Sequence, residues 1–258
     1  MDLSEKYMSA EVVRRQDYGQ TLFSIWIQPP EPLAFRAGQY VAFGLENGDK
    51  VLERAFSIVS SPLEPELEFF IEMVPEGALS PQLHRLHLGD RVLMRKKAKG
   101  IFNIDSKSGH NKHFLISTVT GIAPYVSMVR TFDRDLAAGR SSEPQRLVIL
   151  QGAARSDEFA YDRELNQAAA QFRWLTYVPT ISRPWEDPQW PGERGRVDDL
   201  LRKYSDTLGL DPSATTAYLC GNPGMIVNSR DILRRRGFEP GAIKEETYWA
   251  PGEGEVEY

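Results

Sequence analysis

The 258-residue chain contains very little cysteine, because Cys220 is its single one. One thiol cannot form an internal disulfide, and it cannot supply the four ligands that an iron–sulfur cluster usually needs. No apolar run approaches the roughly 20 residues that cross a bilayer, and the N-terminus lacks a basic segment followed by an apolar one. These absences predict a cytoplasmic protein with no membrane partner, in which any iron–sulfur centre would belong to another protein.

The charge balance excludes a further class of partner. With 31 Lys and Arg against 36 Asp and Glu, the net charge is −5, so we expect no nucleic-acid partner. The basic run Arg95-Lys96-Lys97-Ala98-Lys99 is of a kind that usually forms a solvated strand edge, and it remains a candidate for steering an acidic protein. Nothing in the composition demands more than a monomer.

The first hundred residues predict antiparallel β-structure. Short apolar or alternating runs occur at 21–27, 40–45, 54–59, 67–74 and 91–95, and turn residues such as Asn47-Gly48 separate them. A short helix is expected at 79–88. The spacing predicts a Greek-key β-barrel over residues 1–104.

After a polar linker at 105–112 the pattern changes to alternating strands and helices. Strands are expected at 113–118, 146–151, 174–180, 217–219 and 243–247, and helices at 123–132, 157–171, 197–208 and 224–236. This alternation predicts an α/β domain with a five-stranded parallel sheet over residues 112–258. Ligands of such sheets bind beyond the carboxyl ends of the strands.

Two segments of the barrel half carry candidate binding residues. In Arg54-Ala55-Phe56-Ser57, Arg54 and Phe56 would share one face of a strand. A guanidinium can pair with a pyrophosphate and an aromatic ring can cover a flat ligand, although a surface arginine beside a core phenylalanine would look the same. The segment Gly77-Ala78-Leu79-Ser80 would open the short helix, where backbone N–H groups favour an anion.

The second half places candidate residues after its strands. The loop at 117–124 follows one strand, and Cys220-Gly221-Asn222-Pro223 follows another. Three arginines also follow strands, namely Arg155, Arg183 and Arg196. NADPH differs from NADH by a 2′-phosphate, and fixed positive charge selects for that group. With no acidic residue expected at the corresponding strand end, NADP is favoured over NAD.

In order and spacing, from Gly38-Gln39-Tyr40 to Tyr248-Trp249, these motifs resemble the ferredoxin–NADP reductase family, specifically its bacterial ferredoxin/flavodoxin branch. The resemblance implies FAD in the barrel, with Arg54 on its pyrophosphate, Phe56 against the isoalloxazine and Ser57 near its N5. It also implies further FAD contacts from Ile71, Val74, Gly77, Leu79, Ser80, Thr120, Tyr248 and Trp249.

For the second domain the resemblance implies NADP(H) bound by Thr118, Arg155, Arg183, Arg196, Gly221 and Met225. Ser57, Cys220 and Glu246 would be the catalytic set, with Cys220 positioning the nicotinamide. The implied activity is hydride transfer between NADPH and FAD, and transfer of single electrons between FAD and ferredoxin or flavodoxin.

Two residues depart from the family pattern. Phe56 stands where the family usually has tyrosine, and Val119 replaces the first glycine of its Thr-Gly-Thr loop. Because a β-branched residue tolerates positive φ poorly, Val119 supports an alternative: a flavin-binding redox sensor or electron-transfer subunit without NADPH turnover. A second alternative is an NADH-dependent oxygenase reductase component.

Two other sequence features are the segment after Trp249 and two pairs of histidines. Residues 250–258 would either extend over the flavin or form an acidic tail. The histidine pairs at 84/87 and 110/113 lack a carboxylate or thiolate set, so no metal site is predicted.

Overall fold

The computed structural model describes residues 3–48, 50–141 and 145–247. The predicted FAD contacts Tyr248 and Trp249 and the extension after them lie outside these residues. The chain divides into two compact units. The first holds residues up to Asn103 together with Ala123–Asp135, and the second holds Ile104–Ile122 and residues from Leu136 on.

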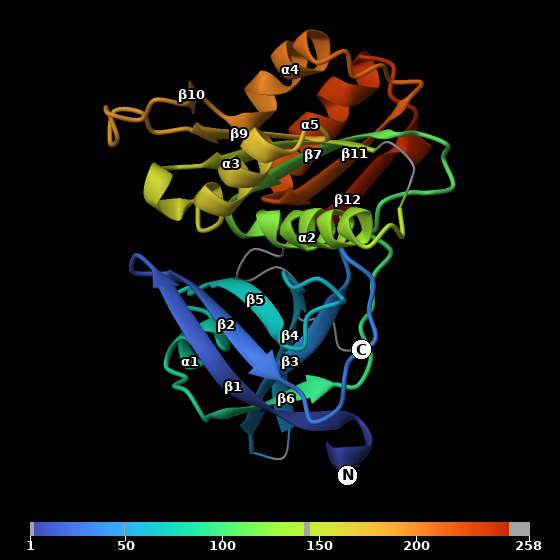
Figure 1. The fold of residues 1–258 in the computed structure, drawn as a ribbon. Helices are drawn as coiled ribbons and strands as arrows, with labels where there is room; N and C mark the ends of the chain where they lie inside the picture. The colour runs from blue at the N-terminus through green and yellow to red at the C-terminus, as the bar shows by residue number, and fades with distance from the viewer. Residues whose placement is uncertain (1–2, 49, 142–144, 248–258) are drawn as a thin grey trace. The chain divides into compact units, whose positions relative to one another are not determined.

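The first unit is built on a six-stranded antiparallel sheet in the order β4-β3-β6-β1-β2-β5 (Figure 1). Beyond β5 the sheet closes on the chain after β4, where Ile58 bridges Phe69 and the Val59 N–H donates to the Glu68 carbonyl at 2.9 Å. Because β6 lies between β1 and β3, the order is of the Greek-key type, and the predicted barrel is confirmed. The strands are β1 (Tyr7–Tyr18), β2 (Leu22–Gln28), β3 (Tyr40–Asn47), β4 (Lys50–Ser57), β5 (Leu67–Glu72) and β6 (Arg91–Arg95).

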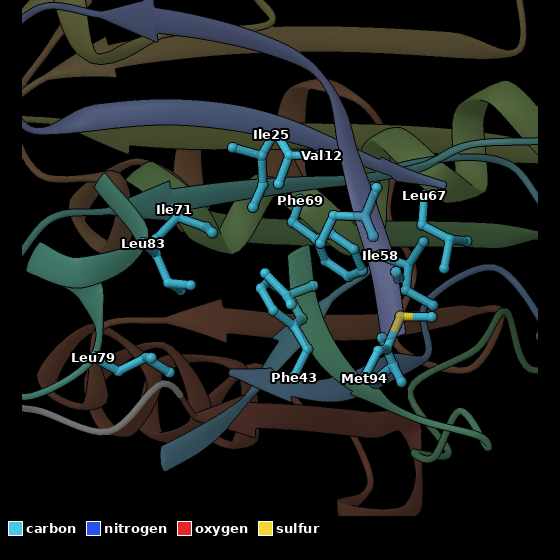
Figure 2. Packing of buried hydrophobic residues seen from close by; sticks show 14 of the residues in the cluster. Val12, Ile25, Phe43, Ile58, Leu67, Phe69, Ile71, Leu79, Leu83 and Met94 are labelled. Atoms are coloured by element: carbon cyan, nitrogen blue, oxygen red, sulfur yellow. The ribbon is translucent and has the colours of Figure 1, made fainter. Parts of the chain in front are cut away.

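Alternating apolar side chains of these strands fill the barrel (Figure 2). Phe43 and Phe69 meet there with ring centroids 4.6 Å apart, and both are fully buried. Helix α1 (Ser80–His84) adds Leu83, and Leu79 just before it is buried in the same core. The sequence did not predict β1, because the polar residues 14–17 hide the alternation in its second half.

Helix α2 (Ala123–Ala137) follows strand β7 (Lys112–Thr118) in the chain but bonds to the barrel through residues of its middle turns. Its Arg130 pairs at 2.5 Å with Glu68, whose side chain is only 2% exposed. The Ser127 hydroxyl donates to the Ser60 carbonyl at 2.6 Å, and Arg134 pairs with Glu64 at 2.6 Å. These bonds satisfy polar groups that burial would otherwise leave costly.

The second unit contains a parallel sheet in the order β10-β9-β8-β7-β11-β12. It has six strands rather than the predicted five. The additional strand, Glu193–Arg194, pairs with Thr180 and Ile181, and it is too short to leave a periodic pattern in the sequence. The strands are β7 (Lys112–Thr118), β8 (Arg146–Ala153), β9 (Leu175–Ile181), β10 (Glu193–Arg194), β11 (Thr215–Gly221) and β12 (Ile243–Thr247).

Helices α4 (Leu201–Thr207) and α5 (Pro223–Arg235) cover one face of this sheet through a shared apolar core. Leu201 of α4 and Leu233 of α5 pack there against Phe114 and Leu219 of the strands. The second unit also contains α3 (Asp162–Gln171), with short 3-10 turns at η2 (Val119–Ile122), η3 (Ser156–Glu158) and η4 (Val197–Leu200). Two predicted helices, 157–171 and 197–208, each split into a 3-10 turn and an α-helix.

Within the residues described, no helix is long and apolar enough to cross a membrane.

Candidate active site

The strand order of the second unit defines a topological switch point. From β7 the chain proceeds to β8, β9 and β10 on one side, and then returns to place β11 and β12 on the other side of β7. In open α/β sheets the ligand crevice lies at such a point, beyond the carboxyl ends of the two strands. The loops that follow β7 and β11 are therefore the candidate nucleotide site.

These two loops touch so closely that glycine is required between them. Gly221 has φ +118°, and a Cβ added there would lie 2.4 Å from Thr118 Oγ1. The same hydroxyl oxygen accepts a hydrogen bond from the Asn222 N–H at 2.9 Å. A Cβ on Gly121 would lie 2.4 Å from the Cys220 carbonyl oxygen. The two glycines thus let the backbones of the loops after β7 and β11 pack directly against each other, and we call this pair of loops the glycine cradle. Its position beyond the strand ends is where a dinucleotide phosphate is expected.

Two of the predicted catalytic residues are adjacent in the sheet. Cys220 is fully buried at the end of β11, and it pairs in register with Ser117 of β7 on one side and Glu246 of β12 on the other. Residues paired in this way share a face of the sheet. The structure therefore brings Cys220 and Glu246 together at the switch point.

Val119 has φ 38°, and it is the one non-glycine residue among those described with a positive φ. The loop keeps a left-handed conformation of the kind that glycine favours, despite the β-branched side chain. That side chain packs against an apolar cluster of Ala153, Phe159 and Ile181. The substitution of the family's glycine thus leaves a left-handed turn in place.

The three predicted phosphate-binding arginines follow strands β8, β9 and β10. Arg155 and Arg183 each lie 3.5 Å from one carboxylate oxygen of Glu186, so this residue brings them together. Arg196 pairs separately with Asp198 at 3.3 Å. Because these side chains are 41%, 52% and 59% exposed, the ion pairs are weak and a phosphate can compete with them.

No acidic residue stands at the end of β8 or β9 itself, but carboxylates from further along the chain accompany the arginines. Besides Glu186, the carboxylates of Asp157 and Glu158 lie 3.3 and 3.4 Å from the Arg155 guanidinium. Asp157 and Glu158 were assigned to a helix, and Glu186 is 31 residues away from Arg155 in the chain. The number of arginines alone therefore overstates the positive charge at this edge of the sheet.

Met225, the remaining predicted nucleotide contact, is buried in the core of the second unit with 1% exposure. Its backbone N–H donates to Asn222 Oδ1 at 3.1 Å, which caps helix α5. Its side chain therefore packs α5 against the sheet, and only its backbone remains as a candidate contact.

In the first unit, β4 presents the candidate flavin-binding residues. Arg54 is exposed and donates to the Glu53 carbonyl at 2.9 Å, and no carboxylate among the described residues lies within ion-pair distance of it. Phe56 is partly exposed, and its ring lies 4.5 Å from Phe43, centroid to centroid. An exposed guanidinium without a competing carboxylate fits a pyrophosphate. A partly exposed aromatic ring that packs on Phe43 fits the face of a flat ligand ring. Ser57 follows at the end of the strand, 6% exposed.

The segment between β5 and α1 forms a tight turn. The Gly77 N–H donates to the Val74 carbonyl at 2.9 Å, and Ser80 Oγ accepts from the Val74 N–H at 3.0 Å. The side chains of Ile71 and Leu79 lie in the barrel core, so only the backbone at these two positions can contact a cofactor. Pro81, which lacks an N–H, removes one of the backbone donors from the first turn of α1.

Sequence reasoning missed Gln151, Tyr177 and Glu186, which contact predicted site residues. Gln151 is buried in β8 and bonds to the carbonyl of Val119, and Tyr177 bonds in turn to Gln151. A glutamine at the end of an otherwise apolar strand was the available signal for this pair. No group of three or more metal-ligating side chains occurs among the described residues.

Two family models match the chain, one in each half. Residues 19–102 match the oxidoreductase FAD-binding domain, and residues 115–231 match the oxidoreductase NAD-binding domain. The chain is 30% identical to a ferredoxin–NADP reductase of Azotobacter vinelandii, covering 84% of each chain. It is 29% identical to a flavodoxin/ferredoxin–NADP reductase of Escherichia coli, covering 94% of this chain and 99% of the other.

A solved structure shows the same fold. The ferredoxin–NADP reductase of Neisseria gonorrhoeae, determined with bound FAD and NADP, superposes with a TM-score of 0.82 at 22% identity, covering 95% of this chain and 99% of the other. With the sequence matches above, this places the chain in the ferredoxin–NADP reductase family of flavin-dependent oxidoreductases.

Proposed function

We propose that the protein is an FAD-dependent ferredoxin/flavodoxin–NADP reductase. The observation that carries the proposal is the combination, on one chain of this family, of the Arg54–Ser57 strand and the glycine cradle at the switch point. FAD supplies the redox chemistry when bound, since it takes up a hydride as one pair of electrons and releases the electrons singly. The protein contributes binding, orientation and electrostatics.

On the flavin side, Arg54 would bind the pyrophosphate and Phe56 would cover the ring. Ser57 would donate or accept a hydrogen bond at the edge of the isoalloxazine. Phe56 offers the ring face of the family's tyrosine but no phenolic hydroxyl, so the hydroxyl of Ser57 becomes the more important polar group of this segment.

On the nucleotide side, Gly121 and Gly221 would hold the loops after β7 and β11 close together, and the pyrophosphate would bind to the backbone of these loops. Arg155, Arg183 and Arg196 would bind the 2′-phosphate in place of their present carboxylate partners. Cys220 would orient the nicotinamide, with Glu246 paired beside it in the sheet.

The acceptor would be an acidic carrier protein, which a basic surface of the first unit supports. Arg36, Lys96, Lys97 and Lys99 are exposed, and none has a carboxylate partner among the described residues. Two backbone hydrogen bonds between Tyr40 and Lys99, at 2.8 and 3.0 Å, connect the segment that contains Arg36 to the segment that contains the three lysines. Unpaired surface cations steer an acidic partner and make association sensitive to salt.

The test is an anaerobic titration of the holoprotein, followed by its visible spectrum. We expect one equivalent of NADPH to bleach the flavin absorbance quickly, and NADH to bleach it slowly. Steady-state reduction of an acidic ferredoxin or flavodoxin should then weaken with added salt, whereas reduction of ferricyanide should change little. A flavin that NADPH does not bleach would contradict the proposal and favour the redox sensor.

A further inference from the structure

The Val119 carbonyl is held by a buried chain of hydrogen bonds that runs across the sheet. Gln151 of β8, which is fully buried, donates from Nε2 to this carbonyl at 3.3 Å. Gln151 Oε1 accepts from the hydroxyl of Tyr177 in β9 at 2.8 Å. Burial, and secondarily the Asp162 carboxyl that also hydrogen-bonds this hydroxyl, raise the pKa of Tyr177, so the phenol remains protonated. The chain of hydrogen bonds thus connects the turn after β7 with strands β8 and β9.

This carbonyl belongs to a residue whose backbone is strained. Val119 adopts φ 38°, a conformation that costs a non-glycine residue stability and that a β-branched residue adopts rarely. Without a restraint, a valine in this loop would return to negative φ for much of the time. The bond from Gln151 and the packing of the valine methyl groups against Ala153, Phe159 and Ile181 are such restraints.

The direction of the carbonyl also fixes the direction of an N–H group. The peptide bond between Val119 and Thr120 is trans, so its C=O and N–H point in opposite directions. With the C=O directed at Gln151 inside the sheet, the Thr120 N–H is directed away from it. Successive N–H groups in a left-handed turn followed by a helical turn form a concavity that binds anions.

We propose that Gln151 and Tyr177 are positioning residues for NADP(H), which hold Val119 left-handed so that the N–H of Thr120, a residue that the family resemblance assigns to FAD, is aimed at the nucleotide pyrophosphate. The inference rests on the proposed function, since it concerns the same nucleotide. In a chain with glycine at this position the turn would need no such restraint. Gln151 and Tyr177 therefore compensate for the valine.

The experiment measures NADP+ binding to the FAD-loaded protein by isothermal titration calorimetry. Tyr177→Phe and the nearly isosteric Gln151→Met each remove part of the chain of hydrogen bonds. We expect the Kd for NADP+ to rise roughly 5- to 20-fold, because only the left-handed fraction of the loop binds. In a Val119→Gly background the same two substitutions should change the Kd less than twofold, because glycine adopts this conformation readily.

Tyr218→Phe is the matched control. Tyr218 is another buried tyrosine of this sheet, and its hydroxyl accepts from the Asp105 N–H at 2.9 Å rather than reaching the loop. It should reduce thermal stability without changing the Kd, and a purely structural role would make Tyr177→Phe behave in the same way.

Three outcomes would overturn the inference. An unchanged Kd in Tyr177→Phe and Gln151→Met would overturn it while leaving the proposed function intact. So would an effect of equal size with and without Val119→Gly. A wild-type protein that binds no NADP+ would overturn the proposed function itself, and this inference with it.

Discussion

Replacing Gly221 with alanine tests the cradle at the switch point. Two separate costs follow from the structure. Alanine must adopt φ +118°, which costs about 1–3 kcal/mol, and its Cβ would lie 2.4 Å from Thr118 Oγ1. Moving Thr118 away breaks its bond to the Asn222 N–H, worth about 0.5–1.5 kcal/mol. We expect Gly221→Ala to lower the free energy of unfolding by about 2–4 kcal/mol.

Gly195→Ala separates these two costs. Gly195 has a similar φ of +121°, but an added Cβ would meet no atom within 4 Å. It should therefore show the backbone cost without the steric one. Guanidinium unfolding of the holoproteins gives both values, and their difference isolates the contact with Thr118.

The same Gly221→Ala variant should bind NADP+ at least tenfold more weakly, since the added methyl group would push the Thr118 loop away from the Gly221 loop and disturb the backbone of both. Titration calorimetry measures this effect on protein that is still folded. The reasoning is refuted if Gly221→Ala costs no more stability than Gly195→Ala and binds NADP+ as the wild type does.

Three further predictions follow from the described contacts. Arg196→Ala should raise the KM for NADPH far more than that for NADH in steady-state assays, and equal effects would contradict its assignment to the 2′-phosphate. Arg54→Leu should weaken FAD binding by roughly 10- to 100-fold, because charge-assisted hydrogen bonds contribute about 1.5–3 kcal/mol; fluorescence titration of the apoprotein measures this. Burial lowers the pKa of His113, so the unfolded chain binds a proton below about pH 6.5 that the folded protein excludes. Stability should therefore fall as pH decreases from that value, by up to about 1.4 kcal/mol per unit. His113→Gln should remove this part of the slope in unfolding experiments, and an unchanged slope would argue against it.

The sequence was sufficient where a signal is local. Alternating apolar residues located β6 at 91–95, and the succession of strands and helices located β12 at 243–247, both with the bounds that the structure has. The order of the motifs likewise indicated the loop that contains Thr118 and the end of the strand that carries Cys220. These signals survive because hydrophobic periodicity and turn chemistry depend on neighbouring residues.

Features that depend on distant residues could not be predicted in this way. The bond from Gln151 to Val119 spans 32 residues and leaves no signal in the sequence. The valine alone therefore suggested that the glycine-type turn was lost. The pairing of Glu186 with Arg155 spans 31 residues, so the balance of charge around the arginines was also hidden. Such contacts become visible only when strand order brings the loops to one edge of the sheet.

The hydrogen bonds of α2 with the barrel have a consequence for how the protein can be divided. The chain passes from one compact unit to the other at residues 103–104, 122–123 and 135–136, so no single cut separates them. A fragment that ends in the linker at 105–111 would keep Glu68 and lose Arg130, which leaves a buried carboxylate without its counter-ion. Proteolytic cleavage in that linker should accordingly yield two pieces that stay associated. The order of domains along the gene is therefore a poor guide to where the protein can be truncated.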